Sequence, residues 1–252
     1  MLNNFPGTRI IGKQVIYLPK CHSTNDIAAE MMRGKAAREG TVIYTDFQEA
    51  GKGQSGNTWE SEAGKNLTFS VILFPGFLKA DQNFFLNVSV ALAVYDSLQT
   101  LLGIKLTVKW PNDLYYAHQK LGGILIENTI RAGRIEGSVA GIGLNIMQEN
   151  FQSGKAISLR NIIPMDHDRI GIFRNLIICL DHRYDQLRNG DFRKLKRDYL
   201  SVLYRYNEPG YFKSTEKFLG RITGIDEYGR LIIETGGSTR VFSLKEVEFL
   251  EE

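Results

Sequence analysis

Lys109 to Asp113 (KWPND) place a cation, an indole ring, a proline, an amide and a carboxylate in unbroken succession. A second lysine, Lys120, then opens an otherwise apolar segment. Lysine ammonium groups stabilise negative charge on a phosphate or a carboxylate, and a nearby carboxylate can hold Mg²⁺ or orient a polar group. Because an ordinary turn needs no such combination, we expect these residues to act on an anionic substrate.

The segment Gly51–Gly56 (GKGQSG) matches the pattern G-x-G-x-x-G. A dinucleotide-binding loop would be followed directly by a helix, whereas a polar, turn-like stretch and then a strand follow here. The phosphate-loop pattern and the protein-kinase elements are absent from the sequence. Glycines still let backbone N–H groups approach an anion, and Lys52 adds a charge. A flexible surface loop explains the segment equally well.

Two further segments have a functional and a structural interpretation. Ser23 to Asp26 stand at the start of a predicted helix, where hydroxyls and amides can hold a polar ligand group or simply cap the helix. Gly141 and Gly143 interrupt a predicted strand (GIGLN). Glycines in a strand mark either a close approach by ligand or backbone, or a bulge.

The periodicity of apolar residues predicts the elements that position these segments. We expect helices at 25–38, capped by Ser23 and Thr24, and at 82–102, 168–188 and 191–206. We expect strands at 41–48, 67–74, 105–110, 121–130 and 134–146, and a small antiparallel barrel within 217–250. Helices and strands do not alternate strictly, which favours an α+β fold over a doubly wound parallel sheet. A turn-rich break predicts two domains, 1–208 and 209–252.

Composition excludes several classes of protein. With 252 residues and 43% hydrophobic residues, the chain can bury a sizeable core, so bulk disorder is excluded. The net charge of +3 gives no electrostatic argument for nucleic-acid binding. The N-terminus lacks the pattern of a signal peptide, and no apolar run approaches the length of a membrane span, so we expect a cytoplasmic protein without a membrane partner. The spacing of the two cysteines and four histidines predicts no structural zinc.

Taken together, the order and spacing of these segments resemble the biotin–protein ligases, from about Tyr17 to the end of the chain. The resemblance implies a mixed-sheet catalytic domain of the biotin/lipoate ligase type, followed by a small SH3-like barrel. It also implies that biotin and ATP, with Mg²⁺, form biotinyl-5'-AMP and pyrophosphate. A lysine of a biotin carboxyl carrier protein domain of a carboxylase then takes the biotin and releases AMP. Homodimers are possible in such a family, since relatives can pair through their sheets.

The resemblance assigns roles to individual residues. The catalytic residues it implies are Lys120, Lys52 and Asp113, with Mg²⁺ close to Asp113. The biotin-binding residues it implies are Ser23, Thr24, Asn25, Gln48, Lys52, Gly53, Gln54, Lys120, Gly123, Gly141, Gly143 and Leu144. The nucleotide-binding residues it implies are Trp59, Lys109, Asn112 and Asn145. The glycine-rich loop has the composition of a lid that excludes water from the hydrolysable adenylate.

The resemblance implies a loop richer in arginine, whereas here Lys52, Gln54, Ser55 and Asn57 occupy positions that are often basic in the family. Fewer charges should hold the adenylate phosphate less firmly, so we expect faster leakage of biotinyl-adenylate. Only 22 residues precede Ser23, too few for the winged helix-turn-helix of some members, and we expect no sequence-specific DNA binding. The alternatives are a lipoate–protein ligase, a non-catalytic biotin or adenylate sensor, and a generic nucleotide-binding module.

Overall fold

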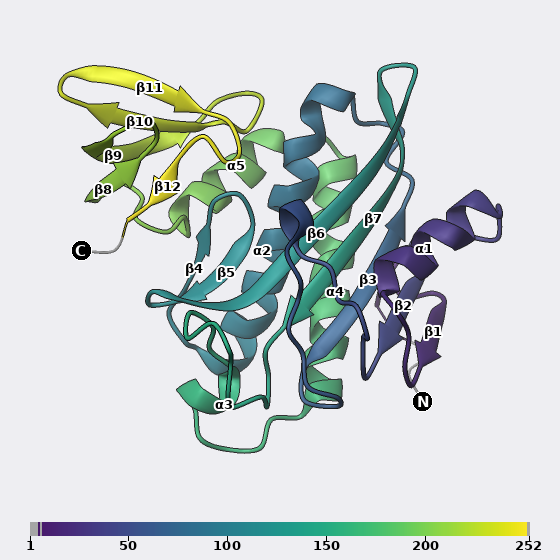
Figure 1. The fold of residues 1–252 in the computed structure, drawn as a ribbon. Helices are drawn as coiled ribbons and strands as arrows, with labels where there is room; N and C mark the ends of the chain where they lie inside the picture. Colours follow the sequence, from purple (N-terminus) through teal and green to yellow (C-terminus); the bar gives the residue numbers. More distant parts are fainter. Residues whose placement is uncertain (1–4, 6, 251–252) are drawn as a thin grey trace.

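A mixed seven-stranded sheet forms the centre of the molecule (Figure 1). The structure is a computed structural model and describes residue 5 and residues 7–250. The strands follow the order β1-β2-β3-β7-β6-β5-β4, in which β1 and β2 are parallel and the other neighbours antiparallel. Their bounds are Val15–Leu18 (β1), Val42–Thr45 (β2), Leu67–Leu73 (β3), Leu106–Lys109 (β4), Asp113–Tyr116 (β5), Gln119–Arg131 (β6) and Arg134–Leu144 (β7).

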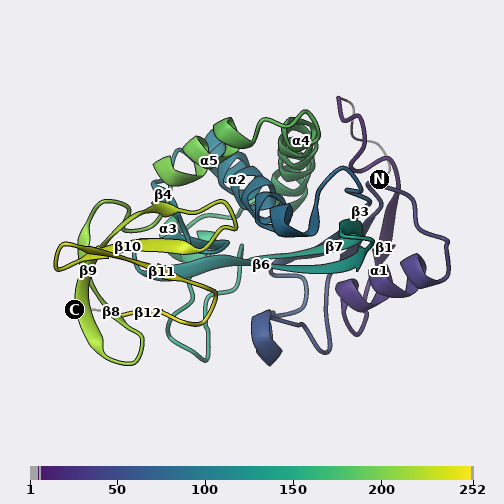
Figure 2. The same ribbon diagram turned by 90° about the horizontal axis from the view of Figure 1, so that it is seen from above.

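The two faces of this sheet are covered differently, as Figure 2 shows. On one face lie α2 (Asn83–Leu102), α4 (Arg169–Arg188) and α5 (Phe192–Ser201), while α1 (Thr24–Arg33) lies on the other face against β3 and β7. The short helix α3 (Leu159–Ile162) follows β7. The glycine-rich loop lies on the α1 face (Figure 2). The α1 face is therefore the one left open to ligands.

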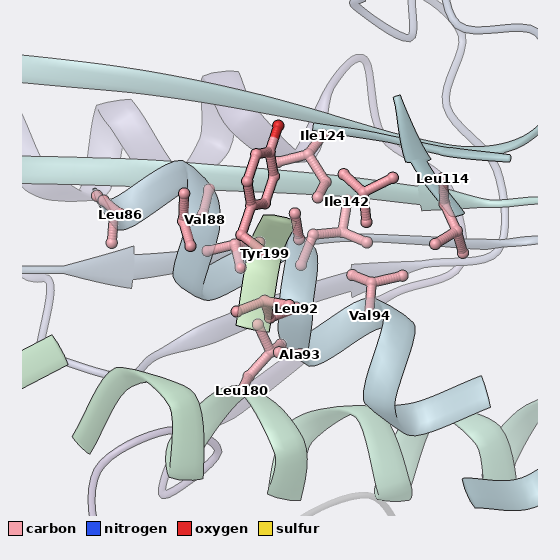
Figure 3. Packing of buried hydrophobic residues seen from close by; sticks show 14 of the residues in the cluster. Leu86, Val88, Leu92, Ala93, Val94, Leu114, Ile124, Ile142, Leu180 and Tyr199 are labelled. Atoms are coloured by element: carbon pink, nitrogen blue, oxygen red, sulfur yellow. The ribbon is translucent and has the colours of Figure 1, made fainter. Parts of the chain in front are cut away.

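Helix α2 is apolar on nearly all sides because it is enclosed on nearly all sides. Its residues Leu86, Val88 and Leu92 are buried in the same cluster as Ile124 and Ile142 of the sheet (Figure 3). The stretch Ala80–Leu102 is long and apolar enough to cross a membrane by length and composition alone. Because α2 is buried between the sheet and α4, its apolar composition is that of a core helix.

The C-terminal part of the chain forms a second, five-stranded sheet in the order β11-β10-β9-β8-β12. Its antiparallel strands are Pro209–Lys213 (β8), Lys217–Ile225 (β9), Leu231–Thr235 (β10), Ser238–Phe242 (β11) and Glu248–Phe249 (β12). A hydrogen bond links this second sheet to the part of the chain that contains the seven-stranded sheet. Trp110 Nε1 donates it to the Gly229 carbonyl at 2.9 Å. The expected fold class, a mixed-sheet α+β unit followed by a small antiparallel β unit, is confirmed.

Several predicted elements were wrong in extent. The strand expected at 41–48 ends at Thr45, and the next residues turn so that Gln48 pairs with Cys21. The helix expected at 191–206 ends at Ser201, because Leu203 pairs instead with Val108 of β4. The helix expected at 25–38 ends at Arg33, before Gly34. Strands β1 and β5 were not predicted, being only four residues each.

Candidate active site

A small cavity of about 50 Å³ lies between α1, the glycine-rich loop and the strands β3, β6 and β7. It gathers most of the residues that the sequence singled out, although they come from distant parts of the chain. The predicted residues that line it are Ser23, Thr24, Asn25, Gln48, Lys52, Gly53, Gln54, Trp59, Asp113, Lys120, Gly123, Gly141 and Gly143. The sheet provides its floor and the loop its roof.

The first turn of α1 is held by Gln48 rather than by its own cap. Ser23 is the N-cap residue but its side chain caps no backbone group, so the predicted capping is wrong in this respect. Instead Gln48 Oε1 accepts hydrogen bonds from the Thr24 backbone N at 2.7 Å and from Thr24 Oγ1 at 2.9 Å. This contact fixes two polar side chains at one end of the cavity, since Thr24 is buried as well.

Asn25 occupies the same polar end and is held on both sides of its amide. Its Nδ2 donates to Glu127 Oε2 at 2.6 Å, and its Oδ1 accepts from Ser70 Oγ at 2.6 Å. Ser70 stands on β3 opposite Gly141 of β7, and both positions face α1. Sequence analysis missed Ser70; its only signal was a polar residue inside the apolar strand LTFSVIL.

Trp59 fills much of the space above the floor of the cavity. A Cβ on Gly143 would stand 2.4 Å from Trp59 Cε2, so only glycine lets the indole ring lie at this depth. The Trp59 Nε1 atom is buried and has no hydrogen-bond partner among the described residues. The pair of glycines in β7 therefore serves a close approach, by Trp59 at Gly143 and by Asn25 at Gly141.

Lys120 and Asp113 form an ion pair at the edge of the cavity, with Lys120 Nζ 2.8 Å from Asp113 Oδ1. Asp113 begins β5 and Lys120 lies near the start of β6, so the hairpin between these strands brings the two together. The ammonium group also lies 5.8 Å from the centre of the Trp59 ring. Both partners remain partly open to solvent, so an incoming anion can reach Lys120.

The glycine-rich loop is closed over the cavity by one ionic and two neutral contacts. Lys52 pairs with Asp26 of α1, and this hydrogen bond raises the pKa of Lys52, so its ammonium stays charged at neutral pH. Gln54 Nε2 donates to Asn112 Oδ1 at 2.7 Å and to the Ile124 carbonyl at 3.2 Å. Asn112 in turn donates to Asn87 Oδ1 of α2 at 2.6 Å, a partner that sequence analysis missed.

A second, larger cavity of about 440 Å³ adjoins the first. Trp59 and Lys120 line both cavities. The remaining lining residues of the second cavity are Thr58, Glu60, Asn145, Phe151, Gln152, Ser153 and Ala156. Asn145 donates to the Ile157 carbonyl at 3.1 Å, but its Oδ1 is buried without a hydrogen-bond partner among the described residues. Asn145 is thus a buried lining residue whose amide oxygen has its hydrogen-bonding capacity unused within the described residues.

Three predicted site residues lie outside both cavities. The Lys109 ammonium lies among aromatic rings, 4.9 Å from the centre of Tyr115 and 5.1 Å from that of Phe249. Leu144 is fully buried in the core. Asn112 lines a third cavity, of about 500 Å³, near the C-terminal sheet, and reaches the first cavity only through Gln54. The roles implied for these residues stay predictions.

The described part of the chain contains no group of three or more His, Cys, Asp or Glu side chains that could hold a metal ion. Asp113 is the carboxylate beside Lys120 in the first cavity. A single carboxylate suits Mg²⁺ when substrate phosphates supply most of the other oxygen ligands.

The site and the fold agree with comparisons to known proteins. Residues 17–145 match the biotin/lipoate A/B protein ligase family, and residues 212–250 match the biotin protein ligase C-terminal domain. A biotin–[acetyl-CoA-carboxylase] ligase of Mycobacterium tuberculosis is 30% identical over 94% of this chain and 90% of its own. The bifunctional ligase/repressor BirA of Bacillus subtilis is 29% identical over 94% of this chain and 74% of its own.

Among solved structures, the biotin protein ligase of Aquifex aeolicus in complex with biotin and ATP has the same fold, with a TM-score of 0.81 and 24% identity. The alignment covers 95% of this chain and the whole of that one. Together with the family match over more than half of the chain, these similarities define the class of protein. The chain belongs to the biotin/lipoate A/B protein ligase family.

Proposed function

We propose that this chain is a biotin–protein ligase, which activates biotin with ATP and passes it to a lysine of a biotin carboxyl carrier domain. The observation that carries the proposal is the pair of adjoining cavities that share Trp59 and Lys120. A ligase that joins two substrates needs two adjacent sites with a cation at their junction. The relatives named biotin–[acetyl-CoA-carboxylase] ligases, from Mycobacterium tuberculosis and Paracoccus denitrificans, support biotin and this class of acceptor.

In the first step, the biotin carboxylate attacks the α-phosphorus of ATP and pyrophosphate leaves, which gives biotinyl-5'-AMP. Two anions must meet for this reaction, and the Lys120 ammonium between the cavities offsets their repulsion. The polar group of Thr24, Asn25 and Gln48 would hold the biotin ring. Asn145, which lines the second cavity, would lie beside the nucleotide.

In the second step, the amine of the acceptor lysine attacks the carbonyl carbon of the mixed anhydride, and AMP leaves with the bonding electrons. Before that attack, water must be kept away from the anhydride. The glycine-rich loop, closed by the contacts of Lys52 and Gln54, supports this role. We propose that Mg²⁺ enters with ATP and meets Asp113, where it would offset charge on the phosphates.

Other expectations about partners follow from this proposal. From Gly123 onward, no strand in the described part of the chain pairs with the outer edge of β6, because β5 pairs with β6 only up to Gly122. An unpaired strand edge supports a homodimer through an extended sheet. The lack of DNA binding, testable by gel shift, and the cytoplasmic location stay predictions.

Transfer of labelled biotin tests the proposal directly. The protein is incubated with ATP, Mg²⁺, a biotin-acceptor domain and either labelled biotin or labelled lipoate. Biotin should appear on the acceptor lysine only with ATP, and Lys120→Ala should slow pyrophosphate release by about 100-fold or more. Lipoate transfer would identify a lipoate ligase, and biotin binding without pyrophosphate release would identify a sensor.

A further inference from the structure

The polar end of the first cavity contains a chain of oxygen atoms at hydrogen-bonding distance. Ser70 Oγ lies 2.7 Å from Thr24 Oγ1 and 2.6 Å from Asn25 Oδ1. Thr24 Oγ1 also lies 2.9 Å from Gln48 Oε1. Ser70, Thr24 and Asn25 are all buried, so water does not readily complete these contacts.

This row of oxygen atoms has fewer hydroxyl hydrogens than oxygen–oxygen contacts. Each hydroxyl carries one hydrogen, and an amide oxygen only accepts. The Ser70 hydrogen goes either to Asn25 Oδ1 or to Thr24 Oγ1, and the Thr24 hydrogen goes either to Gln48 Oε1 or to Ser70 Oγ. In every arrangement at least one of the three oxygen–oxygen contacts lacks a hydrogen.

Two neighbours prevent the amides from turning over to supply the missing hydrogen. Glu127 Oε2 accepts from Asn25 Nδ2 at 2.6 Å, and an ionised carboxylate only accepts, so Asn25 must keep its oxygen toward Ser70. Gln48 Oε1 accepts the backbone N–H of Thr24 at 2.7 Å, so Gln48 must keep its oxygen there as well. The polar end of the cavity thus offers acceptors and needs a donor.

We infer that Ser70 and Glu127 are positioning residues that orient Thr24 and Asn25 as acceptors for the N–H groups of a cyclic urea. Neither Ser70 nor Glu127 lines the first cavity, so each acts through Asn25 or Thr24. The inference rests on the proposed function and deepens it, because the fused ureido ring of biotin carries two N–H donors. Lipoate carries no N–H group and would leave the acceptors unpaired.

The free-energy difference between binding a ureido ring and binding lipoate should be that of a buried polar group left without a hydrogen-bond partner. A site built to hydrogen-bond a substrate group rejects the analogue that lacks it far more strongly than a site that only differs in shape. Removing the Ser70 hydroxyl takes away one of the two groups that hold the Asn25 amide and one partner of Thr24 Oγ1, so the two acceptors are held less firmly. Affinity for every ureido ligand should fall by a common factor, whereas the nucleotide cavity is untouched.

Ser138→Ala is a matched control for Ser70→Ala. Ser138 is equally buried and stands on the neighbouring strand β7, but its hydroxyl has no hydrogen-bond partner among the described residues. The measurements are the Kd for biotin and for desthiobiotin by calorimetry, KM for ATP, kcat for transfer to the acceptor domain, and thermal unfolding. Glu127→Gln, at an exposed position, adds a variant that does not threaten folding.

Ser70→Ala should raise Kd for biotin and desthiobiotin alike, by about 10-fold or more, while KM for ATP stays unchanged. Glu127→Gln should raise both Kd values in the same direction but less, since Glu127 is exposed. A Kd for biotin in Ser70→Ala equal to that in Ser138→Ala would overturn the inference if Ser70→Ala is folded. If Ser70→Ala is unfolded, an unchanged Kd in Glu127→Gln would overturn it. Absence of ATP-dependent biotin transfer by the wild-type protein would instead overturn the proposed function.

Discussion

Gly141 lies directly against Asn25, so that a Cβ on Gly141 would stand 2.2 Å from Asn25 Oδ1. Real Cβ atoms do not approach an oxygen so closely, and Asn25 cannot simply give way because Glu127 and Ser70 hold its amide. Gly141→Ala should therefore displace Asn25 and raise KM for biotin by about 10-fold or more, with little change in KM for ATP.

The control for this prediction is Gly137→Ala on the same strand. A Cβ on Gly137 would meet the end of the flexible Met32 side chain, at 2.2 Å from Cε, and this side chain can move aside. Steady-state kinetics of both variants with biotin and ATP check the prediction. Equal values of KM for biotin in the two variants would show that Asn25 does not contact the substrate.

The sequence predicts that something approaches Gly141 and Gly143 closely, but it does not predict which side chains do so. The motif around Gly141 and Gly143 indicated a close approach by backbone or ligand, but periodicity cannot name the side chains that approach. Asn25 and Trp59 arrive from segments that are far away along the chain. The long, strongly patterned elements, such as α2 and β3, were predicted nearly to the residue because their apolar periodicity spans many positions.

Trp59 should move when ligands bind. The first cavity, at about 50 Å³, is much smaller than the roughly 300–1,000 Å³ of ordinary ligand sites, and the indole ring over Gly143 occupies part of the space. Only one other tryptophan is present, Trp110, which is buried and held by its hydrogen bond to Gly229. Intrinsic fluorescence should therefore change when biotin and ATP are added, and the change should disappear in Trp59→Phe. Binding seen by calorimetry without any change in emission would contradict this prediction.

Lys109 should contribute more to stability than to chemistry. Its ammonium lies near the rings of Tyr115 on β5, Tyr204 before the C-terminal sheet, at 6.0 Å, and Phe249 on β12. Such contacts are worth about 0.5–1 kcal/mol each at exposed sites, so Lys109→Met should lower Tm by about 3–12 °C while pyrophosphate release is retained. Thermal unfolding and a pyrophosphate assay check this. A raised KM for ATP with an unchanged Tm would instead support the nucleotide contact that the motif implied.

The position of Lys109 outside the first two cavities has a physical reason that single-sequence analysis cannot supply. Lys109 and Lys120 have the same chemistry, and both stand beside residues that suit a phosphate site. What separates them is the hairpin of β5 and β6, which brings Lys120 to Asp113, and the C-terminal sheet, which brings Phe249 to Lys109. Long-range contacts of this kind decide which of two equivalent residues faces the cavity. Local patterns of residues do not encode them.

The glycine-rich loop should release the adenylate more readily than loops that carry arginine. Gln54, where the family resemblance leads us to expect a basic side chain, closes the loop through neutral hydrogen bonds to Asn112 and Ile124. Because a neutral amide attracts a phosphate less strongly than a guanidinium does, Gln54→Arg should lower the amount of free biotinyl-adenylate severalfold. Gln99→Arg, an exposed change at the end of α2, controls for net charge. Ultrafiltration after a reaction without acceptor measures the free adenylate, and equal amounts from wild type and Gln54→Arg would mean that the charge at this position does not retain the intermediate.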